Sequence, residues 1–128
     1  MTERRHISSG SPYEPKIGFS RAVRAGDAVY VSGTVAWRED GRLIVEGDVY
    51  AQAKQAIANI EKALIEAGAS LSDVVRTRIY VTDISRIDEV AKAHGEAFGE
   101  IRPASSMIEV SALAEPQMLV EIEAIAVI

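Results

Sequence analysis

The feature that most constrains the fold is one long helical pattern with strand patterns on both sides. Asp48 is a suitable N-cap, and Gly68, which tolerates a positive φ, is suited to end a helix that begins at Val49. The apolar positions that recur at helical spacing are Ala53, Ile57, Ile60 and Leu64, with Ala56, Ala63 and Ala67 beside them. A helix of this length between strands predicts a crossover connection within one sheet.

Two strands and a tight turn are predicted before this helix. Residues 19–24 and 28–35 alternate or cluster apolar side chains around the turn Ala25-Gly26-Asp27, which is a hairpin signal. A second turn, Glu39-Asp40-Gly41, precedes residues 42–45, which we expect to form a short third strand.

Three further strands and a second helix are predicted after it. In Val74–Val81 the side chains alternate between two faces, with Val75, Thr77, Ile79 and Val81 on one and Arg76, Arg78 and Tyr80 on the other. Ser85, with Asp88 three residues later, has the spacing of a capping box and would begin the second helix. Its expected inner face is Ile87, Val90, Ala91, His94 and Phe98, and Gly99 would end it. Residues 105–110 and 119–127 complete the sheet.

The predicted fold class is therefore α/β, in the α+β sense of a single mixed β-sheet with two helices packed on one face. No linker, repeat or low-complexity tract divides residues 1–128, so we expect one domain, with residues 1–15 as a loosely ordered N-terminal arm. The face of the sheet without helices still carries apolar side chains. We expect another subunit to cover it.

Composition excludes several classes of function. The absence of cysteine excludes disulfides and thiolate chemistry, and two histidines offer no metal-binding pattern, so we expect no metal. A net charge of −5 disfavours nucleic acid as a partner, because binding to it depends on neutralising phosphates. No apolar run approaches the ~20 residues of a membrane span. With no signal peptide visible, we expect a cytoplasmic location.

Four strings in order carry a resemblance to a known family. They are Val31-Ser32-Gly33; Val74-Val75-Arg76-Thr77 with Tyr80-Val81-Thr82-Asp83; Arg102-Pro103-Ala104-Ser105 with Glu109-Val110; and Val120-Glu121-Ile122-Glu123-Ala124-Ile125-Ala126. Each alone is a common strand pattern, but their order and spacing are specific. The chain resembles the Rid family, also called YjgF and often described as L-PSP endoribonucleases, over nearly its whole length after the N-terminal arm.

The resemblance implies a chorismate-mutase-like fold that assembles as a homotrimer, with a small-molecule ligand in each inter-subunit cleft. The best-understood members hydrolyse reactive 2-imino and enamine acids to keto acids and ammonia. They need no metal and no organic cofactor.

The resemblance also implies a set of site residues, and this chain departs from the family at several of them. Glu121 matches the family glutamate and is the candidate catalytic residue, and Ser32 matches the family serine. Phe19 stands where tyrosine is usual, and Met107 replaces a frequent cysteine. Ser105 stands where an arginine grips the substrate carboxylate. We expect Phe19, Ser32, Ser105 and Met107 to line the substrate site.

The loss of the arginine makes two other residues relevant. Serine cannot copy the two parallel hydrogen bonds of a guanidinium, so turnover of 2-iminopropanoate should be poor or absent. Arg102, three residues earlier, is a candidate for the missing cation and is included among the substrate-binding residues; the alternative is a surface or interface ion pair. His94 is interpreted as a helix-face histidine at the sheet or at a subunit contact, with catalysis as the alternative.

Three functions remain open from the sequence. The first is a hydrolase, a deaminase of an imine or enamine metabolite with altered specificity. The second is a trimeric protein that binds or senses a small metabolite without deaminating it. The third is an endoribonuclease, against which the acidic charge and the lack of a basic and aromatic surface motif argue.

Overall fold

A computed structural model describes residues 3–43 and 45–128 as one mixed sheet with helices on one side. The strands are β1 (Arg4–Ile7), β2 (Ala22–Ala25), β3 (Ala28–Thr34), β4 (Val74–Val81), β5 (Ala104–Glu109) and β6 (Val120–Val127), in the spatial order β1-β2-β3-β6-β4-β5. The helices are α1 (Tyr13–Ile17), α2 (Val49–Glu66) and α3 (Ile87–Phe98), with single 3-10 turns at Leu71–Asp73 and Ile84–Arg86. The predicted fold class is confirmed.

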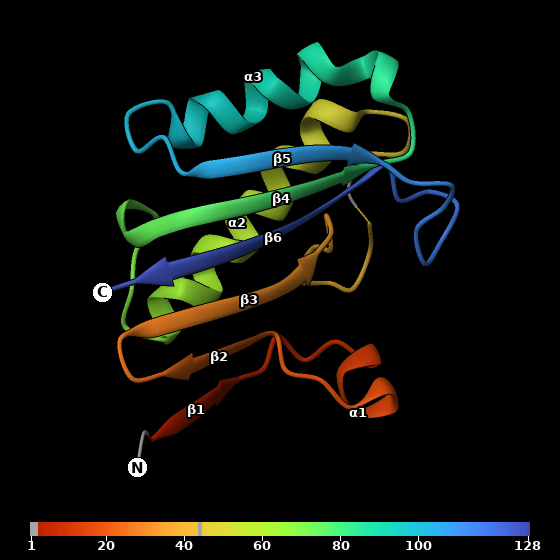
Figure 1. Ribbon diagram of the computed structural model, residues 1–128. Helices are drawn as coiled ribbons and strands as arrows, with labels where there is room; N and C mark the ends of the chain where they lie inside the picture. The colour runs from red at the N-terminus through yellow and green to blue at the C-terminus, as the bar shows by residue number, and fades with distance from the viewer. Residues whose placement is uncertain (1–2, 44) are drawn as a thin grey trace.

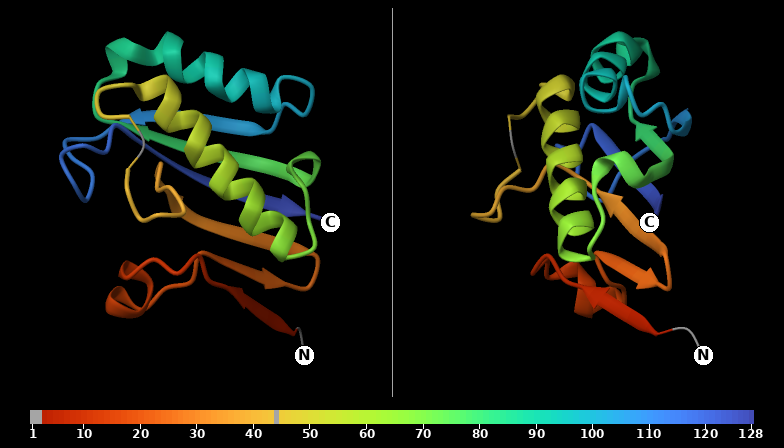
Figure 2. Two further views of the ribbon diagram at one scale, coloured as in Figure 1. Left: turned by 180° about the vertical axis from the view of Figure 1, so that it is seen from behind. Right: turned by 90° about the vertical axis from the view of Figure 1, so that its left-hand side faces the viewer.

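Helices α2 and α3 cover the same face of the sheet, as expected. Seen from behind, α2 crosses the strands diagonally and α3 lies along the β4–β5 edge (Figure 2). Strands β4 and β5 run parallel and flank α3 in sequence, while β3 and β4 are both antiparallel to β6. The helix pair therefore serves two crossovers, which is why both helices lie on one side.

Helix α2 forms for the reasons that the sequence gives. The Asp48 carboxylate accepts a hydrogen bond from the backbone N–H of Ala51 at 2.9 Å, and Gly68 has a φ of 88° just beyond the end. All seven apolar positions predicted to face the sheet are buried: Ala53, Ala56, Ile57, Ile60, Ala63, Leu64 and Ala67. They form one hydrophobic core with Val29, Ile79 and Ile122 of the central strands.

The N-terminal segment is more ordered than expected. Residues 4–7 pair with β2 as an edge strand, and residues 13–17 form α1, which ends at Gly18 with a φ of 94°. Because α1 occupies this segment, Phe19 lies in the turn that follows, and β2 begins only at Ala22 instead of at residue 19. The predicted strand over residues 42–45 is also wrong: Leu43 makes one isolated bridge to Trp37, and Ile44 lies outside the described residues.

Two local predictions around β4 and α3 are corrected. Val75 is exposed, because a register shift between Val74 and Arg76 turns it off the buried face. The capping box at Ser85 does not form; Asp83 instead accepts from the Ser85 backbone N–H at 3.0 Å, and a 3-10 turn precedes α3. Ile87 is consequently exposed, and Ala91, also predicted to face inward, is exposed as well.

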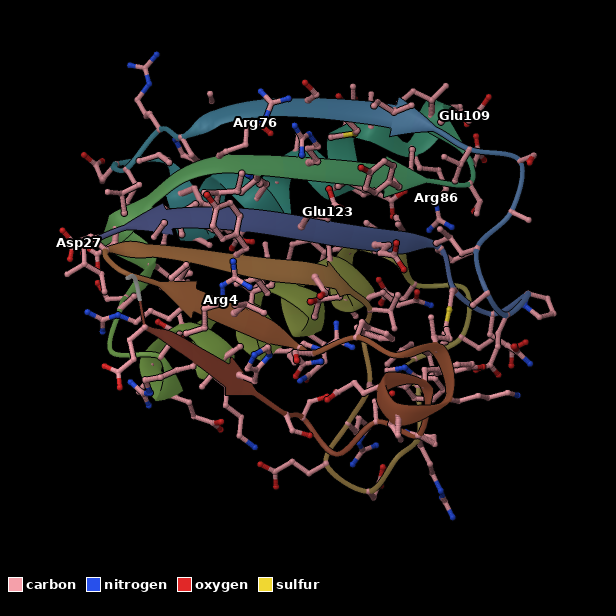
Figure 3. The ribbon with its side chains drawn as sticks, turned by 60° about the horizontal axis from the view of Figure 1, so that its bottom comes forward. Arg4, Asp27, Arg76, Arg86, Glu109 and Glu123 are labelled. Carbon is pink, nitrogen blue, oxygen red and sulfur yellow. The ribbon has the colours of Figure 1, made fainter. Side chains whose placement is uncertain are left out.

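The face of the sheet opposite the helices is open in the single chain. Arg76 and Glu123 project from this face in Figure 3, and Glu123 receives a hydrogen bond from the Tyr80 hydroxyl at 3.0 Å. Tyr30 and Ile108 also belong to it and are 51% and 46% exposed. No helix of the described part of the chain is long and apolar enough to cross a membrane.

Candidate functional site

The predicted residues Ser32 and Glu121 lie together at an irregularity between β3 and β6. The register shifts between Val31 and Thr34, so that Ser32 and Gly33 form a bulge opposite Glu123, and the Glu121 carboxylate lies against Gly33. Bulges re-aim side chains and are common beside active sites. A Cβ added at Gly33 would lie 2.6 Å from Glu121 Oε2, so a larger residue here would require the carboxylate to move. At the bulge the carboxylate of Glu121 therefore packs against the backbone of Gly33.

The environment of Glu121 favours its protonated form. Burial, as the largest cause, and the charge of Glu123 raise the pKa of the Glu121 carboxyl above its ordinary value, while the charge of Arg21 acts in the opposite direction. A carboxyl whose pKa is moved toward neutrality is better able to exchange a proton during a reaction.

The hydroxyl hydrogen of Ser32 is used in a hydrogen bond to the backbone. Its hydroxyl donates to the carbonyl of Ser20 at 2.6 Å, and its own N–H donates to the carbonyl of Arg21 at 2.9 Å. The oxygen of Ser32 remains available only as an acceptor while this bond holds.

Arg21 is a residue of this cluster that the sequence analysis did not single out. It is only 8% exposed, and its Nη1 donates to the carbonyl of Gly33 at 2.6 Å and to Thr34 Oγ1 at 3.2 Å. Its guanidinium carbon lies 5.4 Å from the centre of the Phe19 ring, which gives Phe19 a cation–π partner. The available signal was spacing, because Arg21 follows Phe19 by two residues.

A buried carboxylate balances Arg21. Glu14 of α1 is 5% exposed, and its Oε2 lies 3.8 Å from Arg21 Nε. The same oxygen accepts from the backbone N–H of Ser9 at 3.2 Å and also from the Ser9 hydroxyl. Burial alone would raise the pKa of Glu14, but the hydrogen bonds from Ser9 and Ser8 and the charge of Arg21 outweigh it and lower the pKa. Helix α1 thus anchors the arginine beneath Phe19.

Ser105 and Met107 lie elsewhere, on the edge strand β5. They pair with Thr77 and Ile79 of β4 and share the face on which α3 packs. Met107 is half-buried against the core, whereas Ser105 is exposed. Thr77 Oγ1 donates to Ser105 Oγ at 2.8 Å and lies 2.9 Å from His94 Nε2 of α3. The Thr77 hydroxyl thus links His94 to Ser105 through two hydrogen bonds.

Arg102 lies in the turn between α3 and β5. It has a φ of 55°, and its backbone N–H donates to the carbonyl of Phe98 at 2.7 Å, closing the end of the helix. Because it precedes the strand, the alternation of strand faces does not apply to it. Its side chain is exposed, and it makes no ion pair with any other residue that the structure describes.

One chain therefore does not bring the predicted residues into a single site. Glu121 and Ser32 lie on β6 and β3, while Ser105 lies on β5, which β4 separates from β6. The faces differ as well, because Glu121 alternates with the buried Ile122 and Ser105 is paired with the buried Thr77. The two groups could meet only if β5 of one chain approached β3 and β6 of another.

A cavity among the described residues lies next to the first cluster. It measures about 660 Å³ and is lined by residues 7–13, by the segment after β3 and by α2; Arg21 and Thr34 form the wall it shares with the Glu121 cluster. Glu121, Ser32 and Ser105 do not line it. Within residues 3–43 and 45–128, no three acidic or histidine side chains are grouped in a way that could hold a metal ion.

These features define a small α+β protein with one mixed sheet, two crossover helices on one face and a half-buried carboxylate at a strand bulge. Residues 10–128 match the family described as Endoribonuclease L-PSP. The chain belongs to this family, whose solved members carry the names YjgF/YER057c/UK114 and Rid. The predicted family is confirmed.

Solved structures and relatives agree with this assignment. A Mycobacterium tuberculosis member of the YjgF/YER057c/UK114 family is 52% identical, has a TM-score of 0.90 and is matched over 98% of this chain and 100% of its own. The Rid-family protein YyfA of Yersinia pestis is 32% identical with a TM-score of 0.87, over 98% and 100%. The 3-aminoacrylate deaminase RutC of Acinetobacter baylyi is 33% identical over 94% of each chain.

Proposed function

We propose that this chain is a hydrolase that deaminates a reactive imine or enamine metabolite, and that it works as a homotrimer with its sites between subunits. The observation that carries the proposal is the Glu121 carboxyl, half-buried where it packs against Gly33 at the bulge, with its pKa raised by burial. A relative that is 33% identical is named a 3-aminoacrylate deaminase, which supports the same kind of chemistry.

Glu121 is suited to the proton transfers of such a reaction. Hydrolysis of an imine begins when water attacks the carbon of C=N; the π electrons move to nitrogen, which takes up a proton. Glu121 as carboxylate accepts the proton that water loses and returns it to nitrogen. Glu121 then takes the hydroxyl proton of the resulting carbinolamine and gives it to the amine nitrogen, so that C=O forms as the C–N bond breaks and ammonia leaves. One carboxyl group can serve both steps, since its proton is released and regained.

A cleft between two chains is supported by the separation of the site residues. The edge strand β5 has one neighbour, β4, so its other edge is free to approach a second chain. Such a contact would bring Ser105, Met107 and Arg102 of one chain toward Phe19, Ser32 and Glu121 of the next. No cofactor takes part in this scheme.

The ligand is expected to differ from a small imino acid. Ser105 offers one hydrogen bond where an arginine would offer two charge-assisted ones, and a single bond to a charged group is worth roughly 1.5–3 kcal/mol. The site therefore favours a ligand that is larger or less anionic than 2-iminopropanoate.

The test is ammonia release from freshly generated 2-imino acids. We expect the natural protein to release ammonia above the buffer rate from larger 2-imino acids or their uncharged analogues, and Glu121→Ala to lose at least 10-fold of that rate. Glu61→Ala is the matched control, because Glu61 is an exposed carboxylate on α2. The proposal fails if the natural protein shows no turnover on a panel of imino acids and their uncharged analogues.

A second candidate function is binding without turnover. It is favoured by the hydroxyl of Ser32, whose proton is held by the backbone of Ser20, and by the serine at position 105. In that case calorimetry would detect a ligand while product formation stayed at the buffer rate. Activity that appears only in Ser105→Arg would also favour it, since the scaffold would then be intact and its natural ligand different.

A further inference from the structure

We propose that His94, Thr77 and Ser105 form a hydrogen-bonded chain that presents an outward, uncharged donor at Ser105 and selects a ligand with a neutral carbonyl or amide oxygen. The ligand part rests on the proposed function, because it takes Ser105 to line the site. The chain of hydrogen bonds itself does not depend on any activity.

The three side chains come from three elements and meet at one hydroxyl. Thr77 on β4 is fully buried, and its Oγ1 lies 2.8 Å from Ser105 Oγ on β5 and 2.9 Å from His94 Nε2 on α3. The His94 ring also stacks on Phe98, with 4.7 Å between ring centres, so its orientation is fixed by the core. Both hydrogen bonds have ordinary lengths for such groups.

The direction of the chain follows from counting protons. A threonine hydroxyl has one hydrogen, and Thr77 donates it to Ser105. Thr77 must then accept from His94, which requires the hydrogen of the imidazole to be on Nε2. The Ser105 hydroxyl receives a bond from Thr77, so its own hydrogen is free, and its exposed position on the edge strand directs that hydrogen away from the core.

The chain carries no formal charge at neutral pH. Burial lowers the pKa of His94 below its ordinary value, so the imidazole is neutral there. Arg76, which precedes Thr77 on β4, donates a hydrogen bond to Ser106. Both side chains lie on the face of the sheet opposite to Ser105, so Arg76 adds no charge to the chain of hydrogen bonds. A polarised row of hydroxyls strengthens its terminal donor without adding charge. An uncharged oxygen acceptor satisfies this donor, whereas a carboxylate receives no charge from the chain of hydrogen bonds itself.

The first experiment reads the tautomer of His94 directly. The chain has two histidines, so ¹⁵N NMR of the full-length protein, with His6→Gln to assign the signals, resolves His94. We expect the Nε2–H tautomer and a changed Nε2 shift in Thr77→Val, with the shift retained in Thr77→Ser. Thr82→Val, the same change at the end of β4, is the control. A His94 protonated only on Nδ1 would overturn the proposal, because the chain would then run inward.

The second experiment measures selectivity. Turnover, or binding if no turnover is found, is compared for a 2-imino acid and its primary amide. We expect Ser105→Ala and Thr77→Val each to lower kcat/KM, or affinity, for the amide by about 3- to 10-fold, the size of one neutral hydrogen bond, and to leave the acid nearly unchanged. Equal losses for both ligands, or none for the amide, would overturn the selectivity claim. Absence of any turnover would count against the proposed function alone, since the NMR result stands independently.

Discussion

At the scale of single residues, the cluster around Glu121 places a carboxylate where the fold gains nothing from its charge. The buried Arg21 is already balanced by Glu14, at 3.8 Å, and bonded to Gly33 and Thr34. For Glu121, burial and the repulsion of Glu123 raise the pKa and outweigh the charge of Arg21, which lowers it. Sites that hold a poorly solvated charge commonly sacrifice stability for function.

Replacing this carboxylate should therefore stabilise the protein at neutral pH. The folded-state pKa of Glu121 lies above the unfolded one, so its contribution to stability is fully favourable only below the unfolded pKa and is lost as the pH rises through the folded pKa. We expect Glu121→Gln to have a higher Tm than the natural protein at pH 7. The difference should shrink as the pH falls through the raised folded-state pKa, and it should be smallest below about 4.5, the ordinary glutamate value. Calorimetric scans across this pH range would check it, and a variant less stable at pH 7 would contradict it.

Gly33 should be coupled to Glu121. A methyl group at Gly33 would lie 2.6 Å from Glu121 Oε2, so we expect Gly33→Ala to destabilise the fold by about 1–3 kcal/mol. In a Glu121→Ala background the obstructing carboxylate is gone, and the same change should cost less than about 0.5 kcal/mol. Urea unfolding of the four proteins of this double-mutant cycle measures the difference. Equal costs in both backgrounds would show that the backbone of the bulge, and not the carboxylate, requires glycine.

At the scale of elements, the sequence predicted best those helices and strands whose apolar pattern matches the face that is buried. Asp48 and Gly68 bound α2, and the alternation in β4 gave its bounds, Val74–Val81, because both elements are buried along one face. Strand β1 could not be predicted in the same way. Its four residues expose Arg4, Arg5 and His6, so pairing with β2 and not an apolar pattern defines it.

The same reasoning explains which parts of the candidate site could be anticipated. Glu121 is recognisable as a polar residue within an alternating strand, and Ser32 as a serine at a strand end. Arg21 and His94 act through residues distant in sequence, Glu14 and Thr77, and their contacts depend on how α1 and α3 pack. Such pairings between elements are a property of the tertiary structure.

Gln52 of α2 forms hydrogen bonds to the backbone of the segment before β6, and its substitution tests their contribution to stability. It is fully buried; its Oε1 accepts from the N–H of Leu119 at 2.9 Å, and its Nε2 donates to the carbonyl of Gln117 at 3.0 Å. Gln52→Leu removes the partner of two partly buried backbone groups, at about 1–3 kcal/mol each. We expect a loss of about 2–5 kcal/mol by urea unfolding. Gln55→Leu, a half-buried position one turn later, should cost less than about 1 kcal/mol.

At the scale of the whole molecule, the sheet has one covered and one open face. The open face combines ion pairs such as Arg78 with Glu123, at 3.8 Å, with exposed apolar side chains such as Tyr30 and Ile108. Polar groups that already bond to one another and apolar groups left uncovered are typical of a surface that another protein covers. A symmetric assembly would cover this face and complete the cleft at the same time.

The assembly can be tested by placing a charge on this face. Ile108 lies on the edge strand β5, paired with Tyr80, and is 46% exposed in the single chain. We expect the natural protein to have three times the chain mass in native mass spectrometry at micromolar concentration, and Ile108→Glu to shift it toward the monomer by burying an unpaired carboxylate at the contact. Ile65→Glu is the matched control: Ile65 lies on α2 and is 61% exposed on the helical side, so the trimer should persist. A natural protein of single-chain mass would contradict the trimer, and it would leave Glu121 and Ser105 without a means of sharing one site.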